Sequence, residues 1–192
     1  MRFHRYAALA VLIAAGLLAT VLHRGDRPAA PPAPVGQVVA PPTEADLAFA
    51  GMMIEHHEQA VRMSRALIAK PGQPERVTAI AQFIVHDQQR EIDEMNAWLT
   101  AWDMPAGHHD HDGAGMLTDA QLRELDHATG PRAAPTFLRL MIEHHTGAIT
   151  MARDLLDGGG RNVFTHRVAK HVVNEQTDEN AAMTALLRQL SH

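Results

Sequence analysis

Two short stretches of the chain place adjacent histidines between methionines. Residues 53–63 read MIEHHEQAVRM, and residues 141–151, which lie 88 positions later (141 minus 53), read MIEHHTGAITM. Thioether sulfur is a soft donor that prefers Cu(I) and Ag(I), whereas imidazole also accepts Cu(II) and Zn(II). A set that mixes these donors points first to copper. The candidate ligands are Met53, His56, His57, Met63, Met141, His144, His145 and Met151.

Helical spacing would place these donors at the edge of a core. At about 100° per residue, His56 and Met63 fall on the same side of a helix as the apolar stripe, and His57 lies about 40° from Met53. Met53 is three residues before His56 and four before His57, so one helix can supply two donors and its repeat mate two more. His56 and Met63, two turns apart, could serve a second ion.

A second cluster of possible ligands lies between the two repeats, in the stretch HHDHD at 108–112. The stretch sits in a Gly- and Pro-containing segment that indicates a loop. His108, His109 and His111 can gather Cu(II), Zn(II) or Ni(II) without a rigid geometry, and the alternative is a merely solvated polar loop. The other histidines, among them His86, His166 and His171, read as surface or hydrogen-bonded residues.

Start and stop signals predict the helices that must position these residues. Thr43 with Asp46 resembles a capping box, and Pro71 and Gly72 stop the helix near residue 70. The next helix starts near residue 74 and runs to about 101. A short helix is expected over about 118–130. A third long helix starts at about 135 and ends near 158, and a fourth, capped at 162, runs to about 190.

The repeat continues beyond the histidine motif at the same offset. The segment that starts at residue 81 aligns with the one that starts at 169, so a Gln and a Glu recur on the inward face of each second helix. Two hairpins in one register, about 43–101 and 135–190, predict an all-α four-helix bundle with approximate two-fold symmetry. The residues of the supporting polar core are Gln88, Glu91, Gln176 and Glu179.

Composition excludes several classes of function. The formal charge is −5 and no run of Lys or Arg occurs in the body of the chain, so nucleic acid is not an expected partner. The chain has 14 His and 10 Met but no Cys, which excludes thiolate zinc sites, iron–sulfur clusters and thiol nucleophiles. No catalytic constellation is recognisable, and we do not expect an enzyme.

The N-terminus reads as an export signal. A basic start precedes an apolar run, which makes residues 1–22 a signal peptide or a membrane anchor, the only expected contact with a membrane. Residues 23–42 are rich in Pro and Ala and read as a linker without a core. The bundle over 43–192 is therefore expected in the periplasm or elsewhere outside the cytoplasm.

The helices also resemble a known family. The pattern M-I-x-H-H-x-x-A-x-x-M, followed by Q-x-x-E-I-x-x-M-x-x-W-L, is similar to that of the bacterial family DUF305, a domain of unknown function. Residues 53–63, 88–99 and 141–151 match the pattern, whereas Asn180 and Leu186 depart from it. The resemblance implies a ferritin-like four-helix bundle, and some members of the family are exported copper-binding proteins associated with copper tolerance.

Together these observations favour an exported protein that binds copper, with Cu(I) first and Cu(II), Ag(I) or Zn(II) as alternatives, for sequestration or for handover to another exported copper-handling protein. One alternative is a metal-free structural or interaction bundle. Another is a ferritin-like di-metal oxidoreductase, but its usual pair of Glu-x-x-His motifs is missing from the long helices. The number of ions and the oligomeric state stay open.

Overall fold

The computed structural model describes residues 40–104 and 115–191, and within these ranges all regular secondary structure is helical. The prediction of an all-α fold is therefore confirmed. The long N-terminal segments, 1–22 and most of 23–42, lie outside the described residues, as do His108, His109 and His111. The elements are α1 (Glu44–Ile68), α2 (Glu75–Ala101), α3 (Asp119–His127), a 3-10 turn η1 (Gly130–Arg132), α4 (Ala133–Asp154), a π-helical turn η2 (Leu155–Gly159) and α5 (Val163–Leu190).

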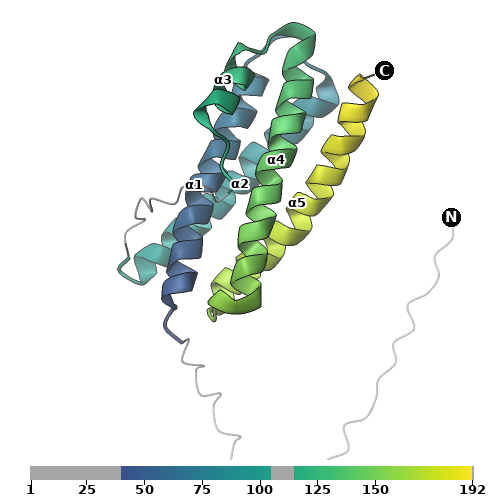
Figure 1. Ribbon diagram of the computed structural model, residues 1–192. Helices are drawn as coiled ribbons and strands as arrows, with labels where there is room; N and C mark the ends of the chain where they lie inside the picture. Colours follow the sequence, from purple (N-terminus) through teal and green to yellow (C-terminus); the bar gives the residue numbers. More distant parts are fainter. Residues whose placement is uncertain (1–39, 105–114, 192) are drawn as a thin grey trace, which may run out of the picture. The chain divides into compact units, whose positions relative to one another are not determined.

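The four long helices form two hairpins that pack against each other (Figure 1). Helix α1 packs along α2, and α4 packs along α5. The hairpins meet mainly through α1 and α4, with a second contact between α2 and α5. The short α3 lies against α1 and α4. The two helices that carry the histidine motifs are therefore in direct contact, as the repeat predicted.

Helix starts follow the capping residues that the sequence indicates. The Thr43 hydroxyl accepts from the Asp46 backbone N–H, and the Asp46 carboxylate accepts from the Thr43 N–H at 2.9 Å, which completes a capping box. Thr118 and Gln121 form the same arrangement at the start of α3. Asn162 caps α5 with its side chain. Each cap pairs backbone N–H groups that have no partner within the helix.

The ends of α4 differ from the prediction. The helix begins at Ala133, two residues before the expected Pro135, because a proline at the third helical position removes only an N–H that has no partner within the helix. At the other end the last turn widens into the π-helical turn η2 before Gly160 ends it. The glycine-rich stop was identified correctly, but the change of helix type was not.

Asp46 ties the start of α1 to the start of α5. Its buried carboxylate accepts from the Thr165 hydroxyl at 2.5 Å and from the backbone N–H groups of Arg161 and Asn162. Burial alone would raise the pKa of Asp46, but the hydrogen bonds from Thr165, Thr43 and the Arg161 backbone lower this pKa to about 2. The repeat mate of Asp46 (46 plus 88) is Ala134, so only one end of the bundle has this tie.

A close backbone approach places the segment after residue 114 across the histidine-bearing helices. A Cβ atom added to Gly147 of α4 would lie 2.3 Å from the Gly115 Cα, and Gly115 has a φ of +77°. Next to this crossing, Gln59 of α1 makes two hydrogen bonds with the Leu117 backbone. Its Oε1 accepts from the Leu117 N–H, and its Nε2 donates to the Leu117 carbonyl oxygen. Space therefore requires glycine at both positions, and at Gly115 the backbone conformation favours it as well.

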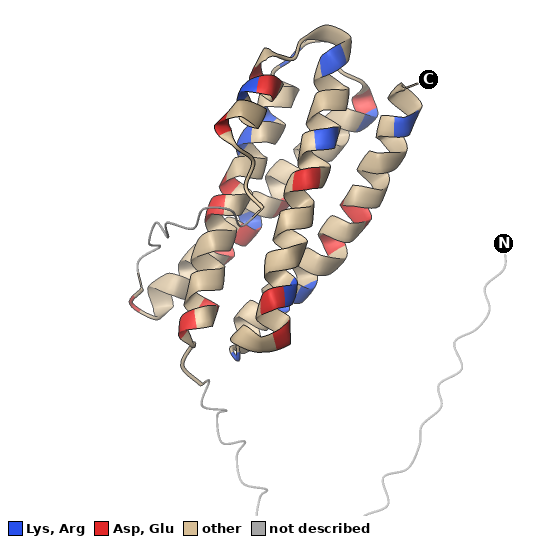
Figure 2. Cartoon of the chain, viewed as in Figure 1, with Lys and Arg blue, Asp and Glu red and all other residues tan. Residues whose placement is uncertain are grey.

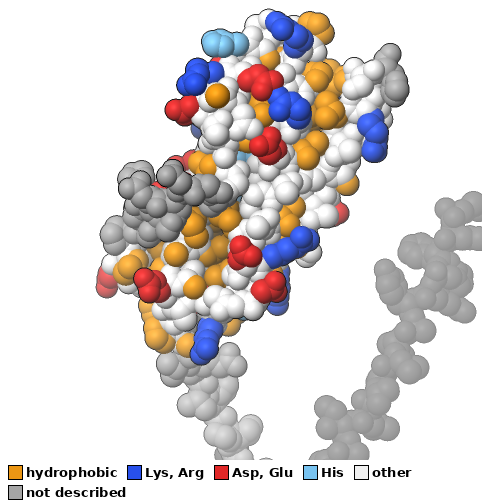
Figure 3. All heavy atoms as spheres, in the orientation of Figure 1, with side chains coloured by type: hydrophobic (Ala, Val, Ile, Leu, Met, Phe, Trp, Pro, Cys, Tyr) orange, Lys and Arg blue, Asp and Glu red, His pale blue; other side chains and the backbone are white. Residues whose placement is uncertain are grey.

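The outside of the bundle carries both signs of charge. Figure 2 shows Lys and Arg interspersed with Asp and Glu along the helices. Among the described residues, no helix has the length and apolar character that a membrane crossing requires. Figure 3 shows apolar side chains gathered on the face of the bundle where α1 and α4 meet.

Candidate metal centre

A layer of four histidines crosses the middle of the bundle. His56 and His57 of α1 and His144 and His145 of α4 are each at most 1% exposed. The ring centroids of His56 and His144 lie 3.7 Å apart with an angle of 36° between the planes. Because these two residues are repeat mates, the approximate two-fold axis passes between their rings. The structure thus brings the four predicted histidines into one layer.

The outer two histidines are held by carboxylates from the neighbouring helices. His57 Nε2 lies 2.7 Å from Glu91 Oε2, and His145 Nε2 lies 2.6 Å from Glu179 Oε2. Glu91 belongs to α2 and Glu179 to α5, so the two bonds are also related by the repeat. Each carboxylate fixes the orientation of its ring and leaves Nδ1 as the remaining ring nitrogen.

Among the described residues, the remaining ring nitrogens are buried without a partner at hydrogen-bonding geometry. This holds for both nitrogens of His56 and His144 and for Nδ1 of His57 and His145. The backbones of Gly115 and His56 approach the His56 and His144 rings, respectively, but their effect on the pKa is smaller than that of burial. The side-chain oxygens of Gln88 and Gln176 are also unpaired. A buried polar atom without a partner costs about 1 to 3 kcal/mol, and native structures contain few of them. Here six such atoms belong to the four histidines of one layer, and they recur in both repeats.

The two central histidines are neutral at physiological pH. Burial in the apolar core, together with the neighbouring His57 and His145, lowers the pKa of His56 to about 3. Burial and the nearby His56 also lower the pKa of His144 well below its usual value. A histidine must be deprotonated to bind a metal. These rings are therefore in the form that a metal ion requires.

We expect the stability of the metal-free protein to fall as the pH drops below about 6.5. An unfolded histidine takes up a proton there, whereas His56 and His144 resist protonation in the folded state, with His56 neutral down to a pH of about 3. The stability that the two neutral rings contribute is thus fully present above pH 6.5 and is lost as the pH falls toward 3. The free energy of unfolding falls by at most about 1.4 kcal/mol per pH unit for each ring.

Urea unfolding between pH 7.5 and 4.5 measures this dependence. In the double variant His56→Leu, His144→Leu the free energy of unfolding should change much less over this range. The same dependence in wild type and variant would show that other groups control the acid sensitivity.

The methionines divide into two groups on either side of the histidine layer. Met63 and Met141 belong to one apolar cluster, which also contains Met183. Met53 and Met151 belong to the other, which also contains Met95. The repeat exchanges the groups, because Met53 corresponds to Met141, Met63 to Met151 and Met95 to Met183. The sequence places Met95 and Met183 at equivalent positions, but they were not predicted as ligands.

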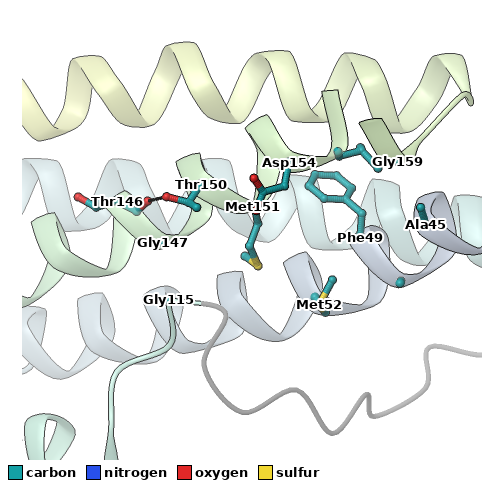
Figure 4. Close-up of a pocket in the computed structure, with 12 residues that line it drawn as sticks. Ala45, Phe49, Met52, Gly115, Thr146, Gly147, Thr150, Met151, Asp154 and Gly159 are labelled. Carbon is teal, nitrogen blue, oxygen red and sulfur yellow. Dashed lines mark hydrogen bonds between the residues drawn. The ribbon is translucent and has the colours of Figure 1, made fainter. Parts of the chain in front are cut away.

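One methionine of the motif can be reached from outside. Met53, Met63 and Met141 are at most 1% exposed, whereas Met151 is partly exposed. It lines a cavity of about 680 Å³ between α1 and α4. Figure 4 shows Met151 extending from α4 toward α1, with Met52 and Phe49 of α1 in the same cavity wall. The cavity therefore connects the surface with one of the two methionine groups.

The structure changes the interpretation of one further histidine. His171 of α5 was expected to be a surface or hydrogen-bonded residue without a role in metal binding, and it lies half-buried beside two carboxylates of α2, Asp87 and Glu91. Its position depends on how α2 and α5 face each other, which spacing within one helix does not reveal. His86 and His166 agree better with the prediction, because His86 is exposed and His166 contacts the Gly160 carbonyl oxygen.

Two repeated hairpins that enclose histidines between methionines define a ferritin-like helical bundle with a buried nitrogen and sulfur donor set. The chain belongs to the DUF305 family, a domain of unknown function, whose profile matches residues 46–187. The resemblance noted from the motifs is thereby confirmed. A comparison with curated proteins found no match.

Solved structures share this fold. A DUF305 fragment from Deinococcus radiodurans is 28% identical, with a TM-score of 0.71, over 78% of this chain and 99% of that one. A DUF305 protein from Streptomyces coelicolor, described as a predicted secreted protein, is 31% identical, with a TM-score of 0.71, over 77% and 94%. CopM in the Cu(I)-bound form is 27% identical, with a TM-score of 0.64, over 75% and 96%.

Proposed function

We propose that the bundle binds copper, with Cu(I) favoured, in the histidine layer and the adjoining methionine groups. The observation that carries the proposal is the set of buried ring nitrogens without hydrogen bonds on His56, His57, His144 and His145. Core packing alone does not require buried polar nitrogens of this kind, and it does not explain why they recur at equivalent positions of both repeats. The ligands would come from these histidines and from Met53, Met63, Met141 and Met151. Ag(I), Cu(II) and Zn(II) are the alternative ions.

The carboxylates support this reading. A histidine that binds a metal commonly donates its other ring N–H to a carboxylate, which fixes the tautomer and raises the basicity of the ligating nitrogen. His57 with Glu91 and His145 with Glu179 have this arrangement. Copper bound to Nδ1 of His57 and to Nδ1 of His145 would complete this carboxylate–histidine–metal arrangement on both sides of the layer.

The donor chemistry favours Cu(I) over harder ions. Met53, Met63 and Met141 offer thioether sulfur in a nearly dry core, which suits a soft monovalent ion. CopM, a relative by structure, has been solved in Cu(I)-bound, Cu(II)-bound and Ag-bound forms. These relatives make copper and silver the first ions to test here.

Sequestration or handover outside the cytoplasm fits this site best. The cavity beside Met151 gives an ion or a docking copper carrier access to one methionine group. The export signal proposed for residues 1–22 would place the bundle in the periplasm or elsewhere outside the cytoplasm. The relative from Streptomyces coelicolor is described as a secreted protein, and this description agrees with the proposed location.

Two other functions receive less support. A metal-free structural bundle would leave the buried ring nitrogens uncompensated. A di-metal oxidoreductase would need carboxylates free to bridge two ions. Glu91 and Glu179 are instead hydrogen-bonded to histidines. We therefore propose a binding protein and not an enzyme.

Titration of the full-length protein with Cu(I) tests the proposal. Under anaerobic conditions, we expect the protein to take Cu(I) from a chromophoric chelator and to unfold at a higher temperature once loaded. An ion that binds only the folded state adds about 2.7 kcal/mol at a free concentration of 100 times Kd. The variant His108→Ala, His109→Ala, His111→Ala should bind Cu(I) as tightly as wild type. If wild type fails to compete and its unfolding temperature does not change, the Cu(I) proposal is wrong.

A further inference from the structure

A second group of ligand-type side chains lies outside the histidine layer, where α2 meets α5. Asp87 and Glu91 are one turn apart on α2, and His171 faces them from α5. His171 Nε2 lies 3.3 Å from Glu91 Oε1 and 3.7 Å from Asp87 Oδ2. One donor atom from each of the three residues lies within 4.8 Å of the others. The group contains oxygen and nitrogen donors only.

The two carboxylates in this group are held in place by other contacts. Glu91 uses Oε2 for His57, which leaves Oε1 toward His171. Asp87 uses Oδ1 for Arg90 one turn away, which leaves Oδ2 toward the same ring. His171 Nε2 is shielded from solvent and makes no hydrogen bond of its own. Two carboxylate oxygens held by other contacts therefore face the unpaired nitrogen of His171.

The surroundings are negatively charged. Burial raises the pKa of Glu175 on α5, and the negative charges of Asp87 and Glu179 raise it further. Carboxylates thus crowd together where α2 and α5 meet, and Arg90 is the cation that pairs with Asp87. A divalent cation would relieve this repulsion, because an opposite charge within a few ångströms favours the ionised carboxylates.

We propose that Asp87, Glu91 and His171 form an outer site for a divalent transition-metal ion such as Zn²⁺. With metal–ligand distances of about 2.0 to 2.2 Å, the donors of a tetrahedral zinc site lie about 3.3 to 3.6 Å apart. The two separations measured from His171 are close to this range. Without sulfur, the site selects Zn²⁺ or Cu²⁺ over Cu(I) and Ag(I). It therefore differs in chemistry from the histidine and methionine core.

The repeat contains a natural control for this site. The mates of Asp87 and Glu91 are Glu175 and Glu179, so the second half also has two carboxylates one turn apart. The mate of His171 is Phe83, which is 49% exposed. The second half therefore lacks the imidazole, and one outer site is expected per chain. Phenylalanine is evidently accepted at this position of the fold.

Zn²⁺ binding by the full-length chain tests the inference. We would remove competing loop ligands with His108→Ala, His109→Ala, His111→Ala and measure Zn²⁺ by competition with a chromophoric chelator. In this background, His171→Phe should weaken the tightest Zn²⁺ site at least about 10-fold, because even the loss of a residue that only orients a metal ligand costs about 10- to 100-fold. Cu(I) affinity should not change, so the result does not depend on the copper proposal.

Phe83→Ala is the matched control, because it changes the repeat mate of His171 without removing a donor, and it should leave Zn²⁺ binding as it was. Asp87→Asn should reproduce the loss seen in His171→Phe. Unchanged Zn²⁺ affinity and stoichiometry in His171→Phe would overturn the outer site. A loss of Cu(I) binding with Zn²⁺ binding intact would overturn it as well, because His171 would then serve the core.

Discussion

Replacing both His56 and His144 with leucine is expected to reduce Cu(I) affinity by more than about 100-fold. Loss of a single residue that only orients a metal ligand already costs about 10- to 100-fold. The double variant removes the two rings that meet at the pseudo-two-fold axis, 3.7 Å apart, and with them four of the buried unpaired nitrogens. No other donor in the layer takes their place, since His57 and His145 each offer only Nδ1.

The metal-free variant should fold at least as well as wild type. Leucine is similar in volume to histidine, and replacing unpaired buried polar groups with apolar ones is close to neutral or stabilising. Anaerobic competition for Cu(I) and urea unfolding measure the two effects. The exposed pair His86→Leu, His127→Leu serves as the control. Wild-type Cu(I) affinity in the buried double variant would exclude the histidine layer as the binding site.

The fourfold variant Met53→Leu, Met63→Leu, Met141→Leu, Met151→Leu is expected to separate the two oxidation states of copper. Each change roughly conserves volume and costs less than about 1.5 kcal/mol when packing alone is involved. Leucine has no donor atom, so Cu(I) and Ag(I) binding should weaken by about 100-fold or more. Cu(II) binding should weaken less, because imidazole serves Cu(II) as well.

Two further methionines affect how this experiment is designed. Met95 and Met183 lie in the same apolar clusters as the mutated residues, so they could partly replace the lost donors. A sixfold variant that adds Met95→Leu and Met183→Leu should remove the Cu(I) binding that the fourfold variant retains. Met104→Leu, Met116→Leu is the control, because both side chains are exposed. If the sixfold variant binds Cu(I) like wild type, the methionines only fill the core.

Much of the fold could be predicted because its determinants are local. The capping box of Thr43 and Asp46 marks the start of α1 through bonds between residues three apart. The shared offset of the repeats then makes α1 and α4 equivalent, and equivalent buried faces pack together. For the same reason the repeat predicted histidines at the edge of the core in both α1 and α4, with Glu91 and Glu179 on the inward faces of α2 and α5.

What could not be predicted depends on how the helices face one another. The cluster of Asp87 and His171 depends on the rotation of α2 relative to α5, which periodicity within one helix does not fix. The grouping of Met53 with Met151, and not with its repeat mate Met141, follows from the antiparallel pairing of α1 with α4, which places unlike ends of the two motifs together. The π-helical turn at Leu155–Gly159 reflects local packing and has no single sequence signal.

The tie made by Asp46 also has a kinetic meaning. Its bonds to Arg161 and Thr165 span 115 and 119 residues, so they form only once the start of α1 has met the start of α5. Interactions that are absent from the folding transition state slow unfolding without speeding folding. We expect these long-range bonds to form late, so that Asp46 prolongs the lifetime of the native state. A cargo ion enclosed between the hairpins would then be retained for as long as the starts of α1 and α5 stay joined.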